Sequence, residues 1–408
     1  MPETIADCVI VGGGIGGAVL ALALGQRGYS VVILERGLNP TNFGRPEVLA
    51  RTTMEAFDRF GAGSRIRQEA AIPLKHLELC QSGRGQLLQL TQEDFQRADA
   101  QPYSTDPART RRMLLEAAAT SQLDVHRGVE VHALIRHGGF TEVQARCDGS
   151  EQAWRTRLVV GDDGGRSIVR AAVGIPLQTQ ELPVEFLGAA GPALPGQPAD
   201  GGQAWFNPSG LHDGLVGGVF MPLPGQRSTL ALLITPEARA RLTASPARFY
   251  TSAEKLSPLC KGLERFHRFP EGFGMFRRPF GHAPRYVSDG VALLGDAVHP
   301  VTPAGGQGAN MSVADALVLA EVAAEALAAG DCSAQRLAAY EAQRRPANAR
   351  SLQFSARANQ GLRIFAVLPW LWKPLVWSLG RINGSPETKI RFLRAVSRAF
   401  VQTLNQDG

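Results

Sequence analysis

The residues of this sequence that most clearly carry chemistry form a glycine-rich run near its start, Gly12-Gly13-Gly14-Ile15-Gly16-Gly17. The run satisfies GxGxxG, in which the first glycine permits a tight turn, the second lets the backbone approach a pyrophosphate and the third allows close helix-strand packing. Glu35 ends the next apolar run, where a carboxylate would accept hydrogen bonds from ribose hydroxyls. The pattern therefore predicts a dinucleotide site. Its predicted members are Gly12, Gly14, Ile15, Gly16, Gly17, Glu35 and Arg36.

Two later segments repeat the order of an apolar strand followed by an acidic, glycine-rich turn. Residues 159–170 contain Asp162-Asp163-Gly164, and residues 293–300 contain Gly295-Asp296. Taken singly, each fits an ordinary turn, because Asp-Gly and Gly-Asp are common turn dipeptides. Residues 303–310 then lead into a predicted helix, whose first N–H groups and dipole would stabilise negative charge on a bound group.

Strands and helices alternate around the first of these motifs. Residues 8–11 and 31–34 are apolar runs typical of buried parallel strands, and residues 15–27 between them have helical spacing. Residues 77–90 alternate like a β-hairpin around Ser82-Gly83. The other expected helices cover residues 46–60, 107–121, 310–329 and 333–357, and the other expected strands cover residues 125–134, 214–220 and 229–234.

Composition narrows the class of protein. The chain has 408 residues, of which 44% are hydrophobic and 20% are charged, as is ordinary for a globular protein with a sizeable core. Its net charge of +6 comes without a basic run interleaved with aromatic residues, so we expect no nucleic-acid partner. Five cysteines without CxxC spacing predict neither a metal site nor a disulfide framework. Because no signal peptide opens the sequence, these features favour the cytoplasm.

With the motifs Gly12 to Gly17, Asp163-Gly164 and Gly295-Asp296 in this order, the sequence resembles the single-component flavoprotein monooxygenases typified by para-hydroxybenzoate hydroxylase. The resemblance covers most of residues 7–350 and implies FAD as the bound dinucleotide. In that family the second motif lies near the pyrophosphate and is implicated in binding both FAD and NAD(P)H. The third motif holds the ribityl chain and the pyrophosphate, and the segment matching residues 303–310 passes beside the isoalloxazine ring.

Carried over position by position, the resemblance implies a larger set of site residues. Those expected to bind cofactor are Arg45, Arg109 (with Arg112 as its alternative), Asp163, Arg170, Gly295, Asp296, Gly305, Gly306, Gly308, Ala309 and Asn310. Pro303 and His299 would lie nearest the chemistry, with His299 either ordering the turn after Asp296 or handling a proton. Asp162 departs from the family, which usually has a small residue there, and adds negative charge near the expected NAD(P)H site.

The resemblance implies that NAD(P)H reduces FAD, that O₂ adds at the flavin C4a position, and that the C4a-hydroperoxyflavin hydroxylates an aromatic, phenolic or lipophilic substrate. The sequence has no second complete GxGxxG, which fits this family and also a flavoenzyme reduced by a partner protein. Two alternatives therefore stay open. One is a related FAD-dependent epoxidase or reductase acting on a lipid or isoprenoid, and the other is a flavin-binding partner protein without turnover.

The expected fold is α/β, with a discontinuous Rossmann-type FAD-binding domain, a smaller, mostly β substrate domain and C-terminal helices. We expect residues 1–75, 100–180 and 281–360 to form the FAD-binding domain, and residues 76–99 and 181–280 to form the substrate domain. The candidates for lining a substrate pocket between the second domain and the flavin are Phe206, Phe220, Met221 and Phe276.

The C-terminal helical segment, residues 361–408, is rich in tryptophan. Trp370, Trp372 and Trp377 lie close to basic residues, a pattern that fits either packing of the segment on the body or peripheral contact with a membrane surface. Pro369 and Pro374 interrupt the apolar stretch, so we expect no transmembrane helix.

Overall fold

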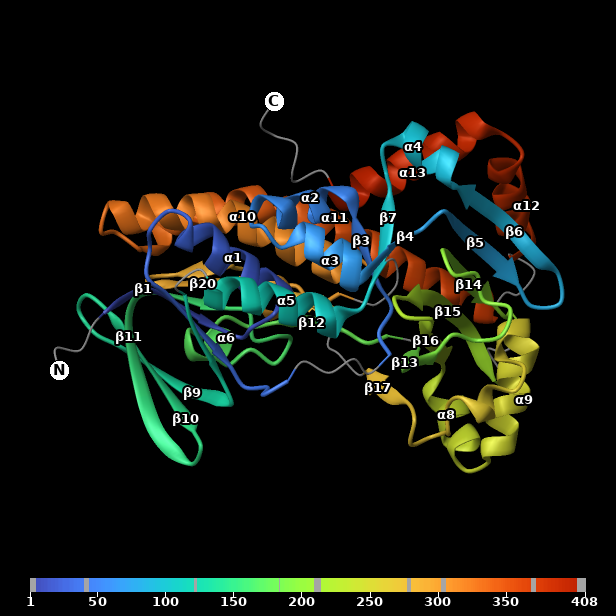
Figure 1. Cartoon of the computed structure of the whole chain (residues 1–408), viewed down its shortest axis with the longest axis horizontal. Coiled ribbons are helices and arrows are strands. Elements are labelled where there is room, and N and C mark those ends of the chain that lie inside the picture. The colour runs from blue at the N-terminus through green and yellow to red at the C-terminus, as the bar shows by residue number, and fades with distance from the viewer. Residues whose placement is uncertain are drawn as a thin grey trace.

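Strand β1 (Ala6–Val11) lies inside a mainly parallel sheet, which explains its uninterrupted apolar run. It pairs in parallel with β2 (Val31–Glu35) on one side and with β11 (Ser150–Gly161) on the other. Figure 1 shows this sheet in one half of the computed structural model, with a second sheet in the other half. The structure describes residues 5–39, 44–120, 123–182, 184–208, 214–276, 280–301, 306–367 and 372–401.

The first sheet contains eight described strands. Their order is β19 (Val287–Ser288), β20 (Val291–Leu293), β11, β1, β2 and β8 (Asp124–Arg127), and β10 (Thr141–Cys147) pairs antiparallel with β11 and with β9 (Val129–Arg136). The carboxyl ends of β1, β11 and β20 therefore lie side by side, and the three predicted motifs each follow one of these strands. Parallel pairing thus brings together turns that are about 150 residues apart in sequence.

The second sheet is mostly antiparallel and has seven described strands. Their order is β17 (Gly274–Phe276), β13 (Glu185–Pro192), β16 (Arg227–Ile234), β15 (Leu215–Leu223), β14 (Gly201–Phe206), β5 (His76–Gln81) and β6 (Gly85–Thr91). The predicted hairpin is confirmed as β5 and β6, and β5 joins the sheet in parallel with β14. Smaller sheets pair β3 (Glu47–Ala50) and β4 (Ala71–Pro73) with β7 (Pro102–Thr105), and β12 (Gln178–Gln180) with β18 (Phe280–His282).

Helices cover the first sheet and flank the second (Figure 1). Helix α1 (Ile15–Gly25) packs against α10 (Gln307–Ala328) so closely that a Cβ on Gly16 would lie 2.2 Å from Ser312 Oγ. The other described helices are α2 (Arg51–Arg59), α3 (Gly63–Glu69), α4 (Gln92–Ala98), α5 (Pro107–Thr120), α6 (Ile168–Ala172), α8 (Pro236–Thr243), α9 (Pro246–Leu256), α11 (Ala334–Val367), α12 (Trp372–Asn383) and α13 (Pro386–Val401). Short 3₁₀ turns cover η1 (Pro258–Cys260), η2 (Leu263–Arg265) and η3 (Gly295–Ala297).

The α/β fold with C-terminal helices is confirmed, and two element boundaries are corrected. The helix expected over residues 46–60 begins only at Arg51, because Glu47–Ala50 pairs as β3 with β7. The strand expected over residues 125–134 is divided into β8 and β9 by Gly128, whose φ of +77° favours glycine. The division of the chain at the expected domain boundaries stays a prediction.

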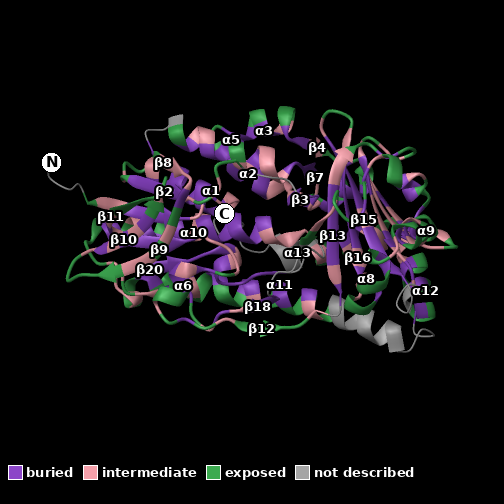
Figure 2. Ribbon diagram, turned by 90° about the horizontal axis from the view of Figure 1, so that it is seen from below, coloured by how far each residue is buried: buried purple, intermediate pink, exposed green. Residues whose placement is uncertain are grey.

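Buried residues gather where the layers face one another (Figure 2). One apolar cluster surrounds the parallel sheet, and a second lies between the antiparallel sheet and helices α8 and α9. A third joins α12 and α13 to α4 and β6, and it includes Trp372, whose ring centroid lies 5.8 Å from that of Phe206. Trp377 is 62% exposed, and Arg381 lies over its ring. Trp370 is outside the described residues. Within the described ranges, no helix is both long and apolar enough to cross a membrane.

Candidate active site

A cavity of about 700 Å³ opens where the turns after β1 and β11 meet the start of α10. This volume lies within the range typical of cofactor and small-molecule sites. Ten of the residues predicted from the sequence line it together: Gly12, Gly14, Ile15, Glu35, Arg36, Arg45, Asp163, Asp296, Gly308 and Ala309. Segments that are far apart in the sequence therefore form one site.

The glycines of the first motif are required by close approach of other backbone and side-chain atoms. Gly12 has a φ of +100°, and a Cβ there would lie 2.3 Å from the carbonyl oxygen of Asp162. A Cβ on Gly14 would lie 2.2 Å from Asp162 Oδ2. Gly16 and Gly17 are buried and do not line the cavity, so they act through packing of α1.

Glu35 is held by several donors rather than left as a free carboxylate. Its Oε2 accepts from Gly13 N at 2.7 Å, and its Oε1 accepts from Gly37 N at 2.6 Å. Arg111 Nη2 lies 2.7 Å from Oε2, and Arg111 Nε donates to Gly13 O. Arg111 therefore links the glycine turn to the end of β2, and it lines the cavity.

The sequence analysis named Arg109 or Arg112 on this helix, whereas the arginine that lines the cavity is Arg111. Arg109 does not line the cavity, because its Nη1 donates to Glu69 O at 3.2 Å and its Nε lies 3.8 Å from Asp106. Arg112 is paired with Glu116. Arg111 lies four residues before the buried Leu115, so helical periodicity places it on the inward face of α5.

The second motif uses Asp163 and Arg170 in different ways. Asp163 lines the cavity, and its Oδ2 accepts from Ile168 N at 2.6 Å and from Val169 N at 3.2 Å, which caps α6. Its Oδ1 is buried and has no hydrogen-bond partner among the described residues. Arg170 is buried outside the cavity lining and donates to Ala297 O at 2.6 Å and to Gly165 O at 3.0 Å. It therefore joins the second turn to the third.

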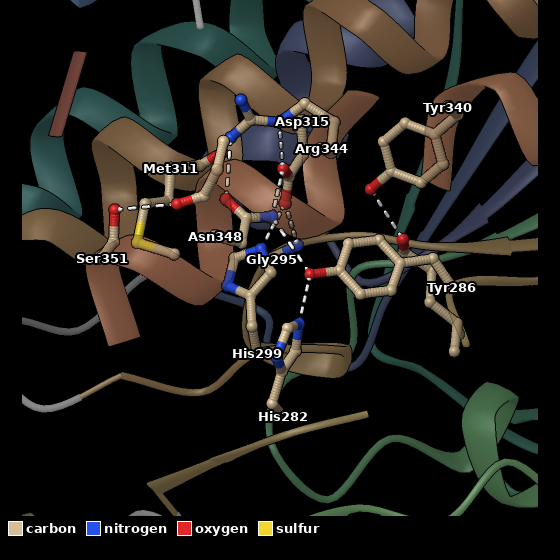
Figure 3. Close-up of polar contacts among 12 residues, drawn as sticks. His282, Tyr286, Gly295, His299, Met311, Asp315, Tyr340, Arg344, Asn348 and Ser351 are labelled. Atoms are coloured by element: carbon tan, nitrogen blue, oxygen red, sulfur yellow. Dashed lines mark hydrogen bonds and ion pairs between the residues drawn. The ribbon is translucent and has the colours of Figure 1, made fainter. Parts of the chain in front are cut away.

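Behind the third motif lies a buried polar network that the sequence did not reveal (Figure 3). Gly295 N donates to Asp315 Oδ2 at 3.1 Å, and Arg344 Nε donates to Asp315 Oδ1 at 2.6 Å. Asn348 Nδ2 donates to the same Oδ1 at 2.9 Å, and His299 Nε2 is paired with Oδ2. These four side chains with Tyr286 are called the Asp315 network below.

Ionisation of Asp315 is favoured despite its complete burial. Burial raises the pKa of this carboxyl, but His299 and Arg344 outweigh burial and hold the pKa well below its usual range. The carboxylate thereby fixes Gly295, whose φ is +59°, and with it the turn that presents Asp296 to the cavity. His299 is 1% exposed and does not line the cavity, so its place in the Asp315 network accords with the turn-ordering hypothesis. A proton-handling role stays a prediction.

The start of α10 is tied to β3 by Asn310. Its Oδ1 accepts from Ala50 N at 2.9 Å and from Thr53 Oγ1 at 2.7 Å, and its Nδ2 donates to Val48 O at 2.9 Å. The side chain is thus occupied by structural bonds and does not line the cavity. Gly306 is the N-cap of α10 with a φ of +65°. Pro303 and Gly305 lie outside the described residues.

Two further charged groups line the cavity beside β3. Arg45 Nη2 lies 3.4 Å from Glu47 Oε2, and Thr105 Oγ1 donates to Glu47 Oε1 at 2.9 Å. Burial raises the pKa of Glu47, although Arg45 opposes the shift. Glu47 was not predicted, because nothing in its local sequence distinguishes it from a surface carboxylate.

Of the expected substrate-pocket residues, the three whose side chains the structure describes do not line this cavity. Phe220 is 0% exposed in the core of the second sheet, and Met221 is buried. Phe206 packs against Trp372, and the side chain of Phe276 lies outside the described residues. Their assignment to a substrate pocket stays a prediction.

The cavity suits the dinucleotide that the motifs predict. The N-caps of α1 and α10 are glycines that make no side-chain capping bond. Apart from the N–H of Gly17, which donates to Asp162, first-turn N–H groups can therefore serve an anionic ligand. The unpartnered Oδ1 of Asp163 can accept a hydrogen bond from a ligand. Asp296 and Glu35 add carboxylates that suit sugar hydroxyls.

Comparison with known proteins decides which dinucleotide this is. Residues 5–355 match the protein family described as FAD binding domain, over most of the chain. The chain belongs to the FAD binding domain family. The cofactor of the site is therefore FAD, and the resemblance to flavoprotein monooxygenases is confirmed.

Relatives within the FAD binding domain family extend over most of the chain. Ubiquinone hydroxylase UbiL of Rhodospirillum rubrum is 30% identical over 376 residues, which cover 85% of this chain and 79% of that protein. The 3-demethoxyubiquinol 3-hydroxylase of Escherichia coli is 26% identical over 351 residues, with 80% and 81% covered.

Solved structures share the fold. PqsL of P. aeruginosa, in complex with 2-aminobenzoylacetate, aligns with a TM-score of 0.76 at 24% identity over 89% of this chain and 99% of that chain. The p-nitrophenol 4-monooxygenase PnpA of Pseudomonas putida aligns with a TM-score of 0.78 at 19% identity over 97% and 98%. At these identities the likeness shows the architecture alone.

Proposed function

We propose that this member of the FAD binding domain family is a monooxygenase that uses NAD(P)H and O₂ to hydroxylate an aromatic or phenolic substrate, with lipophilic phenols of the ubiquinol type as the first candidates. The observation that carries the proposal is the convergence of the three motif turns and the start of α10 on one cavity. The hydroxylase activities named for relatives of up to 30% identity supply the reaction class.

The residues around the cavity have separable tasks in this function. Bound FAD supplies the redox chemistry by accepting electrons from the nicotinamide and delivering them to O₂. The glycine turn and Arg111 would position the adenosine half of FAD, and Asp296 would accept hydrogen bonds from the ribityl hydroxyls. The dipole of α10 favours negative charge at the end of the cavity lined by Gly308 and Ala309. Pro303 and His299 remain the proposed residues nearest to the reacting atoms.

The runner-up is an FAD-dependent epoxidase or reductase on a lipid or isoprenoid, reduced by a partner protein. The exposed ring of Trp377 beside Arg381 favours contact with a lipid-bearing partner surface or membrane in either case.

The experiment that separates the two functions follows the flavin absorbance. Purified protein with bound FAD is mixed anaerobically with NADPH or NADH, with and without a ubiquinol-type phenol. Bleaching that a phenol accelerates, followed in air by a hydroxylated product, supports the monooxygenase. Flavin that neither nucleotide reduces contradicts it and favours the runner-up.

A further inference from the structure

Asp162 lies where the three motif turns meet. It directly follows β11, and its N–H donates to Val11 O at 2.8 Å. Its Oδ2 accepts from Gly17 N at 2.8 Å, so it satisfies a first-turn donor of α1 from another strand. A Cβ on Gly14 would lie 2.2 Å from Oδ2, and one on Gly295 would lie 3.2 Å from Oδ1. One carboxyl group is therefore packed between the first and third motifs.

The charges around the cavity make this carboxyl group unusual. Among the described residues, six carboxyl groups and four arginines line the cavity, so acids outnumber bases there before any ligand is considered. The acids are Glu35, Glu47, Glu130, Asp162, Asp163 and Asp296, and the bases are Arg36, Arg45, Arg111 and Arg166. A dinucleotide brings an anionic pyrophosphate to the same place. The electrostatic cost of binding it falls if one of the inner carboxyl groups is neutral.

Asp162 is the carboxyl group best suited to be neutral. Burial raises its pKa well above the usual value. The hydrogen bond from Gly17 N opposes this rise, and the neighbouring carboxyl groups of Asp296 and Asp163 add to it. Arg111, from α5, opposes this shift only weakly because it is already paired with Glu35. From α11, the Tyr340 hydroxyl donates to Leu293 O, and burial keeps that hydroxyl protonated by raising its pKa.

We propose that Asp162 is a positioning residue of the FAD site that takes up a proton as the cofactor binds, and so couples FAD affinity to pH. The inference rests on the assignment of the cavity to FAD. The proton comes from solvent and remains on the carboxyl group, while the other oxygen continues to accept from Gly17 N. The pyrophosphate favours the neutral form, so the bound state holds the proton more tightly than the free state does.

The direction of the effect follows from this linkage. FAD binds more tightly to the protonated form, so the Kd for FAD rises as pH rises through the pKa of the free protein. For one linked proton, the limiting change is about tenfold in Kd per pH unit. Binding also removes protons from a weakly buffered solution.

The test starts from protein carrying FAD. It is diluted at pH values from about 6 to about 9, a window above the ordinary pKa of aspartate, and free flavin is measured after ultrafiltration. We expect release to increase with pH in the wild type. In Asp162→Asn, which keeps an acceptor for Gly17 N but cannot ionise, release should vary less than about twofold over the same window. Glu130→Gln removes an exposed carboxylate from the same cavity and should keep the wild-type slope.

A second measurement does not depend on any variant. FAD is added to stripped wild-type protein in weak buffer with a pH indicator dye, at a pH where FAD release from the wild type is rising, and the proposal requires net proton uptake there. Flat wild-type affinity, release of protons, or an unchanged slope in Asp162→Asn would each overturn it. Protein that binds no FAD at any pH would instead overturn the cofactor site itself, so the two failures are distinguishable.

Discussion

Arg344 Nε donates to Asp315 Oδ1 at 2.6 Å, and the two side chains are 1% and 0% exposed. This ion pair lies in the layer beneath the Gly295 turn and connects α11 to α10 (Figure 3). Neither residue lines the cavity. The Asp315 carboxylate nevertheless accepts from Gly295 N and so determines the shape of the turn that carries Asp296. The stability of the FAD site is therefore linked to a charge pair that lies outside the cavity lining.

Breaking this pair should be costly. Arg344→Met leaves Asp315 buried with fewer partners, and we expect the free energy of unfolding to fall by about 3–5 kcal/mol. The control is Arg65→Met, which removes exposed ion pairs with Glu69 and Glu116 and should lower the stability far less. Urea unfolding followed by circular dichroism measures both. Equal losses in the two variants would contradict the role given to the Asp315 network.

Acid should weaken the contribution of Asp315. Because its pKa is lower in the folded than in the unfolded chain, its stabilisation is present above the unfolded value of about 3.9 and is lost as pH falls toward the folded value. Asp315→Asn lacks this linkage. The difference in unfolding free energy between wild type and Asp315→Asn should therefore narrow below about pH 4. A constant difference in urea midpoints down to the acid limit would count against the assignment.

Arg111 should matter for FAD retention more than its neighbour on the same helix. Arg111→Met removes the charge-assisted hydrogen bonds that hold the glycine turn and Glu35 in place, worth about 1.5–3 kcal/mol. Because FAD must then order this turn itself, the Kd for FAD should rise by up to about a hundredfold. Arg112→Met, whose side chain pairs with Glu116, should change the Kd less than about threefold. Fluorescence titration of stripped protein with FAD separates the two. A larger effect of Arg112→Met would instead support Arg112, which the sequence analysis named as the alternative to Arg109.

Any side chain at Gly14 should clash with another residue of the protein. Gly14→Ala brings a Cβ to within 2.2 Å of Asp162 Oδ2, and Gly14→Val is worse, so both should lose FAD. Adding Asp162→Ala to Gly14→Ala removes the clashing oxygens and should recover part of the flavin content. The flavin to protein absorbance ratio of the purified variants is the measurement. No recovery in the double variant would mean that the Cβ obstructs FAD itself.

Substitutions of the two described tryptophans of α12 should differ in their effect on stability. Trp372→Ala removes a buried ring from the third apolar cluster and should cost about 3–5 kcal/mol of stability. Trp377→Ala should cost about 0.5 kcal/mol or less, because that ring is 62% exposed. Trp377 is therefore the clean probe of membrane contact. If wild type and Trp377→Ala sediment equally with anionic liposomes, the ring takes no part in such contact.

Much of the site was predictable because its signals are local. Gly12 and Gly295 mark backbone turns that glycine suits, and Asp163 and Asp296 follow apolar strands whose parallel pairing forces the turns together. The helix predicted over residues 46–60 was given too early a start for the opposite reason. Glu47–Ala50 is extended because it pairs with Thr105 and its neighbours. No local sequence pattern indicates a partner strand about 55 residues away.

The residues that were missed depend on helix phase and tertiary contact. Tyr340, Arg344 and Asn348 are spaced four apart on the buried face of α11, so periodicity offered a signal that their polar character concealed. Arg111 likewise required the inward face of α5 to be known. Asp162 was recognisable in the sequence only as a departure from the family, and its contact with the α1 turn became visible only in three dimensions.

The interleaving of the motifs along the chain has a consequence for biosynthesis. Strand β1 emerges from the ribosome first, but its neighbour β11 is about 150 residues away, and α10 begins only at Gln307. A nascent chain that stops before α10 lacks the helix end and the Asp315 anchor, so its FAD site is incomplete. Until α10 has been synthesised, protein contacts alone must hold the glycine turn. FAD binding is therefore a late step in the synthesis and folding of the chain.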